Sequence, residues 1–471
     1  MYENDISAWF DAPQRREELL SALTRLVAVK SVKGEPAEGA PYGPGPRAAL
    51  DEGLRLCAEL GFTVRDYDHR VGLADLNDKP TGLHILGHLD VVGEGTGWDT
   101  DPYTCVERDG MLYGRGVSDD KGPVCAALLA MEAVKELNIP LKYNVRAILG
   151  SDEECGSSDV AYYYAREPFT PCAFTPDAEF PLINVEKGQY FPDFGRSWAP
   201  SAAVPRISAL TGGSRHNVVP PEAQAHIVGL KSADVAPLCA PIEAATGARL
   251  TLTDAGDGCD IHCLGRNAHA ATPTDGVNAI CALLEMLCKL PLADCGSADA
   301  VRALHALFPF GDTEGKALGI AMADAESGAL TLNFAMTTLT ETGFTGKFDA
   351  RVPVSATEQN CRQVVEAAFA QYGMAVTGDG AMAPAHCVPA DTPLVKTLLS
   401  CYETYTGERD ARPIAIGGGT YVHDIPGGVA FGCQFPGFDP KMHSANEQEP
   451  VDGLLRSAKI FALAIARLCG A

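Results

Sequence analysis

The sequence predicts an α/β protein with a mainly parallel sheet in one discontinuous domain and an α+β domain inserted into it. Short apolar strands alternate with amphipathic helices, a pattern typical of a parallel sheet. Acidic and histidine residues follow the strands, at the sheet edge where such folds bind ligands. This acidic pattern stops near residue 188 and resumes after 382. We therefore expect a catalytic domain formed by 1–188 and 383–471, and an inserted lid domain formed by 189–382.

The elements of the catalytic domain follow from the spacing of apolar residues. Leu50, Leu54 and Ala58 recur every four residues, as on one face of a helix that ends before Gly61. Helices are expected over 15–28, 47–60 and 122–137, with a proline- and glycine-rich loop over 34–46. Short apolar strands are expected over 83–86, 144–149 and 173–174.

The inserted segment has elements of its own and no acidic cluster of the same kind. Its strands are expected over 223–230 and 330–335, and its helices over 277–290 and 358–371. We therefore place the chemistry in the flanking segments and the control of access in the insert.

Composition narrows the class of protein. The 471 residues are 46% hydrophobic and 21% charged, which is ordinary for a globular protein of two or three domains. The formal net charge of −24 argues against a nucleic-acid partner, because phosphates require a basic surface. The N-terminus lacks a signal pattern, and no apolar run reaches the roughly 18 residues of a membrane span. We expect a cytoplasmic protein without a membrane partner, whose 16 scattered cysteines are reduced.

Several short segments offer oxygen and imidazole ligands that suit Zn²⁺, Mn²⁺ or Co²⁺. They are His88-Leu89-Asp90, Asp119-Asp120, Asp152-Glu153-Glu154, Asp177 and His443. Two adjacent cations need at least one bridging carboxylate and further ligands to complete each shell. The segments supply that number and leave Glu153 for proton transfer. Together they predict a hydrolytic site with two metal ions.

Each segment also has a simpler interpretation when it is taken alone. His88 and Asp90 could be a surface histidine and a capping residue, although a metal-bound imidazole usually donates its other N–H to such a carboxylate. Asp119 and Asp120 could cap the helix that follows. The segment 152–154 could be an exposed acidic loop. The order of the segments, each after a strand or in a glycine-rich turn, favours the metal site.

Two further histidines are candidates for roles outside the metal shell. His269 lies in the segment 265–273 of the insert, where it could stabilise an oxyanion or simply belong to a structural loop. His423 follows a run of glycines and could be a ligand. His443 lies in the better context for a ligand, so His423 stays unassigned.

The motifs resemble those of the M20 metallopeptidase family, most of all its dipeptidase V branch. The matching stretches are 87–92, 114–122, 152–154, 176–181, 186–188, 217–220, 268–273, 417–421 and 443–447. The run Pro176-Asp177-Ala178-Glu179-Phe180-Pro181 and the long insert point to that branch. The resemblance implies a fold of the phosphorylase/hydrolase-like, zinc exopeptidase type.

The resemblance also implies a role for each acidic or histidine segment. His88, Asp119 and Asp177 would hold one cation, and Asp119, Glu154 and His443 the other, with Asp119 bridging. Glu153 would be the general base and then the acid, and Asp90 would orient His88. A cis peptide bond is implied between Asp119 and Asp120.

The substrate-binding residues are implied in the same way. Asn217 and His269 would bind the oxyanion or the substrate, and Gly418 and Thr420 would contact the substrate. Arg351 would take the C-terminal carboxylate, since a guanidinium pairs with a carboxylate through two hydrogen bonds. The chain departs from the family at Ala270, where glycine is frequent, and at Val422-His423, where Ala-Arg is frequent. An insert of this length implies a monomer.

We therefore expect a dipeptidase with two divalent cations that hydrolyses small peptides with a free N-terminus. Zn²⁺ is the expected metal, with Mn²⁺ and Co²⁺ as alternatives. Two other functions remain open on the sequence: an M20-type deacylase of N-acyl amino acids, and a metal- or peptide-binding module without catalysis.

Overall fold

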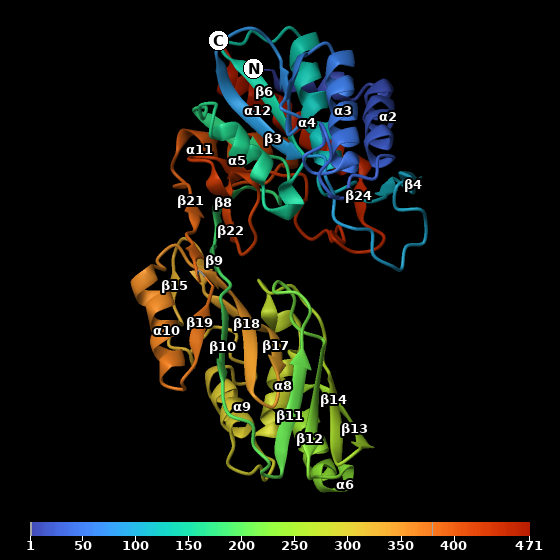
Figure 1. The fold of residues 1–471 in the computed structure, drawn as a ribbon. Coiled ribbons are helices and arrows are strands. Elements are labelled where there is room, and N and C mark those ends of the chain that lie inside the picture. The colour runs from blue at the N-terminus through green and yellow to red at the C-terminus, as the bar shows by residue number, and fades with distance from the viewer. Residues whose placement is uncertain (1, 379) are drawn as a thin grey trace. The chain divides into compact units, whose positions relative to one another are not determined.

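The computed structural model describes residues 2–378 and 380–471, which form two compact units. The first unit comprises the chain up to Val185 together with Cys387–Ile414 and Gly419–Ala471. The inserted unit comprises Glu186–His386 and Ala415–Gly418. Each unit has its own hydrophobic core, and Figure 1 labels the elements of both. The sequence-based domain limits stay a prediction, and they did not include the segment Ala415–Gly418 in the insert.

The first unit combines a central sheet with helices on its faces. Its helices are α1 (Glu3–Phe10), α2 (Pro13–Val27), α3 (Pro44–Glu59), α4 (Lys121–Glu136), α5 (Ser158–Tyr164), α11 (Pro393–Thr406) and α12 (Val451–Cys469). Its strands include β1 (Thr63–Tyr67), β2 (Val71–Asp75), β3 (Thr81–His88), β6 (Asn144–Gly150), β7 (Cys172–Thr175), β8 (Ile183–Glu186), β21 (His386–Cys387) and β23 (Val429–Ala430). A small separate sheet contains β4 (Val106–Arg108), β5 (Met111–Tyr113) and β24 (Gln448–Pro450).

The central sheet confirms the predicted α/β fold. Its strand order is β1-β2-β6-β3-β7-β23-β8-β21. The neighbouring strands β6, β3, β7 and β23 run parallel, whereas β1 and β2 pair antiparallel, as do β2 and β6 and β23 and β8. The sheet is therefore mixed, with the parallel strands at its centre.

Alternating side chains of the central strands pack on two different hydrophobic clusters. In β3, Leu83 and Ile85 belong to the larger cluster, which includes residues of α2, α3, α4, α11 and α12. Leu86 of β3 and Ile148 of β6 point to the opposite face and join a smaller cluster with Tyr163 of α5. Because successive side chains of a strand point to opposite faces, both faces of the sheet are covered.

Local sequence signals explain where several helices begin and end. In α11, Thr392 accepts a hydrogen bond from the N–H of Val395, Pro393 takes the first position, and Gly407 ends the helix at φ 76°. The predicted helix over 47–60 begins earlier, at Pro44, inside the segment predicted as a loop. Proline suits this position because the first N–H of a helix has no partner within the helix.

The inserted unit is built on an antiparallel sheet with helices. Its helices are α6 (Ser232–Val235), α7 (Cys239–Thr246), α8 (Ala279–Leu287), α9 (Gly296–Leu307) and α10 (Gln363–Ala370). Its strands are β9 (Gly188–Tyr190), β10 (Asp193–Ser197), β11 (Arg206–Gly212), β12 (Glu222–Val228), β13 (Arg249–Ala255), β14 (Gly258–Leu264), β15 (Ala323–Asp324), β16 (Gly328–Ala329), β17 (Thr331–Leu339), β18 (Gly343–Val352), β19 (Ala375–Thr377) and β20 (Met382–Ala383). The main sheet runs β13-β14-β12-β11-β17-β18-β10-β19.

Phenylalanine rings form the centre of the inserted unit. The ring of Phe194 on β10 stacks on Phe369 of α10, with centroids 4.5 Å apart. Phe308, just after α9, stacks on Phe334 of β17 at the same distance and lies 5.7 Å from Phe194. All four side chains are buried. This cluster joins two strands to two helices that are distant in sequence.

A search of the described helices finds none with the length and apolar character required to cross a membrane.

We expect Phe194→Ala to lower the free energy of unfolding of the inserted unit by about 3–5 kcal/mol, because the change leaves a cavity between stacked rings. Tyr372→Ala is the matched control, since Tyr372 lies in the same unit and is 37% exposed. Urea unfolding followed by the near-ultraviolet signal of the aromatic residues measures both. Equal effects of the two substitutions would contradict the assigned core.

Candidate metal centre

Three neighbouring parallel strands bring acidic and histidine residues to the same edge of the sheet. His88 is the last residue of β3, Asp152 comes two residues after β6, and Asp177 comes two residues after β7. The strand order β6-β3-β7 makes these strand ends neighbours. The sequence placed the same residues after strands, and the parallel pairing now explains why they meet.

The two carboxylate oxygens of Asp119 face two different histidines. His88 Nε2 lies 3.0 Å from Asp119 Oδ1 and 3.5 Å from Asp177 Oδ2. His443 Nε2 lies 2.8 Å from Asp119 Oδ2 and 3.2 Å from Glu154 Oε2. Asp119 therefore occupies the position between two groups of possible ligands.

The donor atoms form two groups that could each hold a metal ion, one of which contains Glu153 where the resemblance implied Asp119. His88, Glu153 and Asp177 form one group with ligand atoms within 4.8 Å of one another, and Asp119, Glu154 and His443 form a second. Donors of a tetrahedral shell with bonds of about 2.1 Å are separated by roughly 3.4 Å, close to the distances above. Among the described residues, Glu154 Oε1 is buried and has no hydrogen-bond partner. An unsatisfied carboxylate oxygen of this kind is a fitting metal ligand.

Burial and crowding shift the pKa values of the cluster. Burial raises the pKa of Glu153 well above its usual range, and it also raises the pKa of Asp177. Hydrogen bonds that His443 donates to Asp119 and Glu154, the one to Asp119 foremost, raise the pKa of His443 to about 11. Burial opposes protonation of His88, but its hydrogen bonds to Asp119 and Asp177 raise the pKa well above the ordinary value. A buried group of carboxylates requires positive charge, either as protons or as bound cations.

Asp90 contacts His88 chiefly through its backbone carbonyl, whereas the motif suggested its carboxylate. The nearest acceptor to His88 Nδ1 is the backbone carbonyl of Asp90, at 3.0 Å, whereas the Asp90 carboxylate is 3.5 Å away. That carboxylate instead accepts the backbone N–H groups of Glu153 and Glu154, at 3.2 and 3.1 Å. Asp90 therefore fixes both the imidazole and the turn that carries the two glutamates.

The peptide bond between Asp119 and Asp120 is cis, as the family resemblance implied. Asp120 is completely buried, and its Oδ2 accepts the backbone N–H of His88 at 3.0 Å. Burial raises the pKa of this carboxyl well above its usual range, with repulsion from Asp177 adding to the shift. Asp120 thereby connects the start of α4 to the end of β3.

Comparison with known proteins identifies the family. The model of peptidase family M20/M25/M40 matches residues 84–467. The chain belongs to the M20 peptidase family. A protein of Bacillus subtilis (strain 168) named "Putative dipeptidase YtjP" is 35% identical over 461 residues, which cover 97% of this chain and 98% of the relative. A protein of Staphylococcus aureus (strain MRSA252) named "Putative dipeptidase SAR1836" is 31% identical over 466 residues, with the same coverage.

A solved structure shares the fold of this M20 peptidase. Human carnosine dipeptidase 1 is similar with a TM-score of 0.56 and 18% sequence identity, over 99% of both chains. The family makes the chain a hydrolase that acts on peptide substrates. It excludes the alternative of a binding module without catalysis.

Glu447 connects the loop that carries Asp119 to the loop that carries His443. Its Oε1 accepts the backbone N–H of Ser118 at 2.9 Å and that of Asp119 at 3.1 Å. Its Oε2 accepts a hydrogen bond of 2.7 Å from Arg115 Nη1, and the pair is almost fully buried. The position of the central aspartate therefore depends on a residue more than 300 positions further along the chain.

A second buried carboxylate holds the loop in front of Glu153. Asp159 Oδ2 accepts the backbone N–H groups of Ser151 at 2.6 Å and Asp152 at 3.1 Å. The same oxygen accepts the hydroxyl of Tyr421 at 2.7 Å. The tyrosine of the glycine-rich motif thus fixes the acidic loop.

Sequence reasoning did not assign functions to these supporting residues. Glu447 appeared only as a residue that matches the family, and Asp159 did not appear at all. Lys121 was also missed: its side chain is completely buried, and Nζ donates to the carbonyls of Leu26 and Val29. Their partners are remote in sequence, so the sequence could not predict these contacts. It showed only that charged side chains lie next to the motifs.

The predicted substrate residues of the inserted unit lie in two adjoining segments and one strand. The segments of Asn217 and His269 lie together: the N–H of Ala270 donates to the Asn217 carbonyl at 2.9 Å, and Val218 forms an isolated bridge with His269. The side chain of His269 is exposed. Thr420, in the first unit, caps a short 3-10 helix by accepting the N–H of Val422 at 3.4 Å. The substrate roles of these residues, and of Gly418, stay predictions.

The guanidinium of Arg351 already has partners within the inserted unit. Nε and one terminal nitrogen donate to the two oxygens of Asp349, both at 2.8 Å. Nη1 donates to the carbonyl of Gly417 at 2.8 Å. A guanidinium has five N–H donors, so these three hydrogen bonds leave two for other acceptors.

We expect Glu447→Gln to lower the affinity of the enzyme for divalent cations by about 10–100-fold, because the residues behind metal ligands set their position. The amide has one acceptor oxygen instead of two and no charge to offset Arg115. Asp452→Asn is the control, since Asp452 is exposed at the start of α12. Titration with Zn²⁺ against a chelating dye measures the affinity. An unchanged affinity in Glu447→Gln would show that Glu447 does not position the site.

Proposed function

We propose that this M20 peptidase is a dipeptidase that uses two divalent cations to hydrolyse dipeptides with a free N-terminus. The observation that carries the proposal is the position of Asp119, whose two oxygens lie 3.0 and 2.8 Å from two different histidine nitrogens. A single carboxylate between two ligand groups is the arrangement that a bridged pair of cations requires. The relatives named as dipeptidases support the choice of substrate.

The proposed ligands divide between the two cations. His88 and Asp177 would complete one shell, Glu154 and His443 the other, and Asp119 would belong to both. Bound cations supply Lewis acidity that polarises the scissile carbonyl and acidifies the attacking water. The imidazole of His443 is 52% exposed. Within the first unit, a substrate could therefore reach the proposed metal centre from the side of His443.

Glu153 is the proposed proton carrier. Its backbone N–H is held by Asp90, and its carboxylate lies in the same group as His88 and Asp177. Glu153 takes a proton from the attacking water and then gives it to the departing amine, so one carboxylate serves as base and acid in turn. A carboxylate that is mostly desolvated keeps the proton until the amine leaves.

The inserted unit is proposed to act as the lid that recognises the substrate. His269 and Asn217 would stabilise the developing oxyanion, and Gly418 and Thr420 would contact the peptide. The two remaining N–H groups of Arg351 would bind the C-terminal carboxylate of the substrate. In a dipeptide this carboxylate lies one residue from the scissile bond, so its recognition would select dipeptides.

We further propose that the chain works as a monomer of the dipeptidase V branch with Zn²⁺ as its metal. Within the inserted unit, a 10-stranded sheet contains the strands from β9 to β20 except β15 and β16, so a single chain supplies a long continuous surface. Sedimentation velocity of the metal-loaded protein tests the first point, with a dimer as the contrary result. Anomalous scattering at the zinc edge from crystals of the purified protein tests the second.

The substitution Glu153→Gln is expected to lower kcat on dipeptides by about 10²–10⁴-fold while metal binding stays near the wild-type value, because an amide cannot carry the proton. Glu154→Gln, the same change one residue later, is expected to weaken metal binding instead. Steady-state assays and metal titration of both variants separate the two roles. Turnover near the wild-type rate in Glu153→Gln would remove the general base from the proposal.

For Arg351→Lys we expect KM for a dipeptide to rise at least about tenfold, because lysine cannot make the paired hydrogen bonds of a guanidinium. KM for the corresponding dipeptide amide should not change, since it has no terminal carboxylate. Arg362→Lys, remote on the short π-helical turn before α10, serves as the control.

A substrate panel tests the reaction class independently of any variant. Dipeptides, tripeptides and N-acyl amino acids are assayed on the same metal-loaded preparation. Hydrolysis of dipeptides in preference to the others supports the proposal. Turnover of N-acyl amino acids alone would make the enzyme a deacylase.

A further inference from the structure

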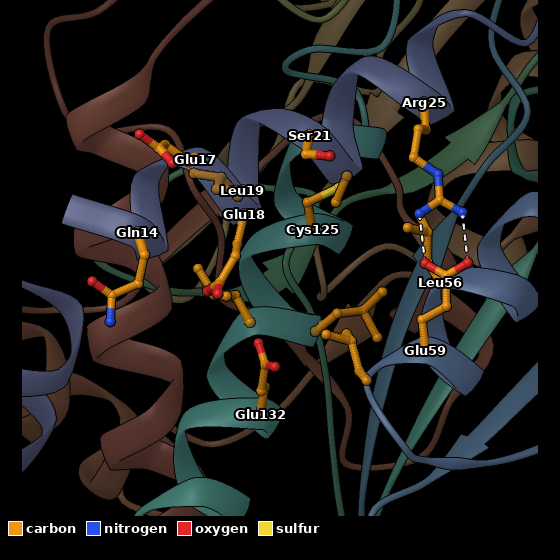
Figure 2. A pocket seen from close by; sticks show the side chains of 14 residues that line it. Gln14, Glu17, Glu18, Leu19, Ser21, Arg25, Leu56, Glu59, Cys125 and Glu132 are labelled. Carbon is orange, nitrogen blue, oxygen red and sulfur yellow. Dashed lines mark hydrogen bonds and ion pairs between the residues drawn. The ribbon is translucent and has the colours of Figure 1, made fainter. Parts of the chain in front are cut away.

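A cavity of about 410 Å³ lies in the first unit between helices α2, α3 and α4. Figure 2 shows the side chains that line it. None of them is a candidate metal ligand or a predicted substrate residue. The cavity is therefore a separate feature, and the hydrolytic reaction does not explain it.

The inner wall of this cavity is apolar. Leu19 of α2, Leu56 of α3 and Leu128 and Leu129 of α4 line it, together with the thiol of Cys125. All of these side chains are at most 5% exposed. Burial raises the pKa of Cys125 above its ordinary range, so this thiol is neutral at pH 7 and acts as part of the apolar wall. A ligand that fills the cavity must therefore carry an apolar body.

The rim of the cavity is acidic, and most of its charges are paired. Arg25, the one basic residue lining the cavity, donates to both oxygens of Glu59, at 2.6 and 3.1 Å, and to Glu52 at 2.6 Å. These Arg25–Glu59 hydrogen bonds are the dashed lines in Figure 2. Glu18 pairs with Arg15 at 2.8 Å. The arginine charge is thus already balanced within the protein.

Glu132 differs from the paired carboxylates Glu18 and Glu59 of the cavity. Its Oε2 is buried and has no hydrogen-bond partner among the described residues. In Figure 2 the carboxylates of Glu132 and Glu18 point toward each other across the cavity. Burial raises the pKa of Glu132 to about 7, and the negative charges of Glu18 and Glu136 add to the shift. A carboxylate in such surroundings gains most from a cationic partner.

We propose that this cavity binds a small organic ammonium ion with an apolar body, in which the ammonium group pairs with Glu132 and the body packs on the leucines of α2, α3 and α4. An anion is excluded because four glutamates line the cavity against one arginine that is already paired. A dipeptide or a free amino acid fits poorly, since its own carboxylate would face the same glutamates. The ligand class is therefore an amine without a carboxylate.

A metal ion is not the occupant of this cavity. A divalent cation needs several oxygen or nitrogen donors in one shell, and no group of possible metal ligands among the described residues includes a residue of this cavity. The surrounding wall consists of leucine and a protonated thiol. An ammonium group needs only one or two carboxylates and leaves the apolar wall to the rest of the ligand.

Isothermal titration of the metal-loaded full-length protein with three matched compounds tests the proposal. The probes are 2-phenylethylammonium, its neutral analogue 2-phenylethanol, and the anion 3-phenylpropionate. We expect the ammonium ion to bind at least about tenfold more tightly than the alcohol, and the anion not to bind, because a charge-assisted hydrogen bond adds to the same apolar contact. Equal affinities for the ammonium ion and the alcohol would overturn the proposal.

Variants assign the binding to this cavity. Glu132→Gln should reduce the affinity for the ammonium ion to that for the alcohol, whereas Glu136→Gln should leave it unchanged, because Glu136 lies one turn away and pairs outside the cavity with Trp9 and Arg15. Ser21→Phe, which fills the cavity from α2, should abolish binding of both compounds. Circular dichroism confirms that each variant is folded.

One more variant separates this inference from the proposed hydrolytic function. Glu154→Gln is expected to impair the metal site and to keep the full affinity for 2-phenylethylammonium, because Glu154 is not part of the cavity. Loss of ammonium binding in Glu154→Gln together with full binding in Glu132→Gln would place the ligand at the metal site and refute the proposed cavity site.

Discussion

The structure of the first unit depends on holding several carboxylates and the imidazole of His88 together out of water, beside the half-exposed imidazole of His443. Asp119 has an exposed fraction of 4% and lies within 3.0 Å of nitrogen atoms on both sides. Moving one ionised carboxylate into such surroundings is costly unless charge of the opposite sign accompanies it. The cluster is therefore unfavourable to the fold by itself and becomes favourable when positive charge is bound. The free-energy cost of burying these carboxylates and their affinity for cations therefore have the same physical origin.

The carboxylates around this site fall into two classes that differ in their partners. Asp90, Asp159 and Glu447 accept backbone N–H groups, which fixes the loops in which the other acids lie. Asp119 and Glu154 direct oxygens at imidazole nitrogens. The hydrogen bonds of the first class come from backbone N–H groups, so they do not use the oxygens of Asp119 and Glu154 that face the imidazoles. They hold the second class in place, and a site built in this way requires little rearrangement when the metal binds.

The sequence predicted the parts of this arrangement that depend on local pattern. Apolar strands followed by acidic residues placed His88 and Asp177 at the ends of what proved to be neighbouring parallel strands. The contact between Glu447 and the N–H of Ser118 could not be predicted in that way, because it joins loops separated by more than 300 residues. The helix α12 packs on α4 in the core. It was not predicted, because its segment contains no candidate ligand or motif. The pairing of Arg351 with Asp349 was not predicted either. The sequence suggests that the arginine binds a substrate carboxylate, but it cannot show that Asp349 of the same strand already accepts two of its hydrogen bonds.

Raised carboxyl pKa values occur at two places in this unit with different physical meaning. At the metal centre, Glu154 is surrounded by other oxygens and by imidazole nitrogen, so several donors converge on one point. In the cavity between α2, α3 and α4, Glu132 has an apolar wall on one side and Glu18 on the other. Convergent donors select a small cation of high charge, whereas an isolated carboxylate on an apolar wall selects a monovalent cation that carries hydrocarbon. The same perturbation of a carboxyl group thus predicts two kinds of ligand, and the number of donors nearby decides between them.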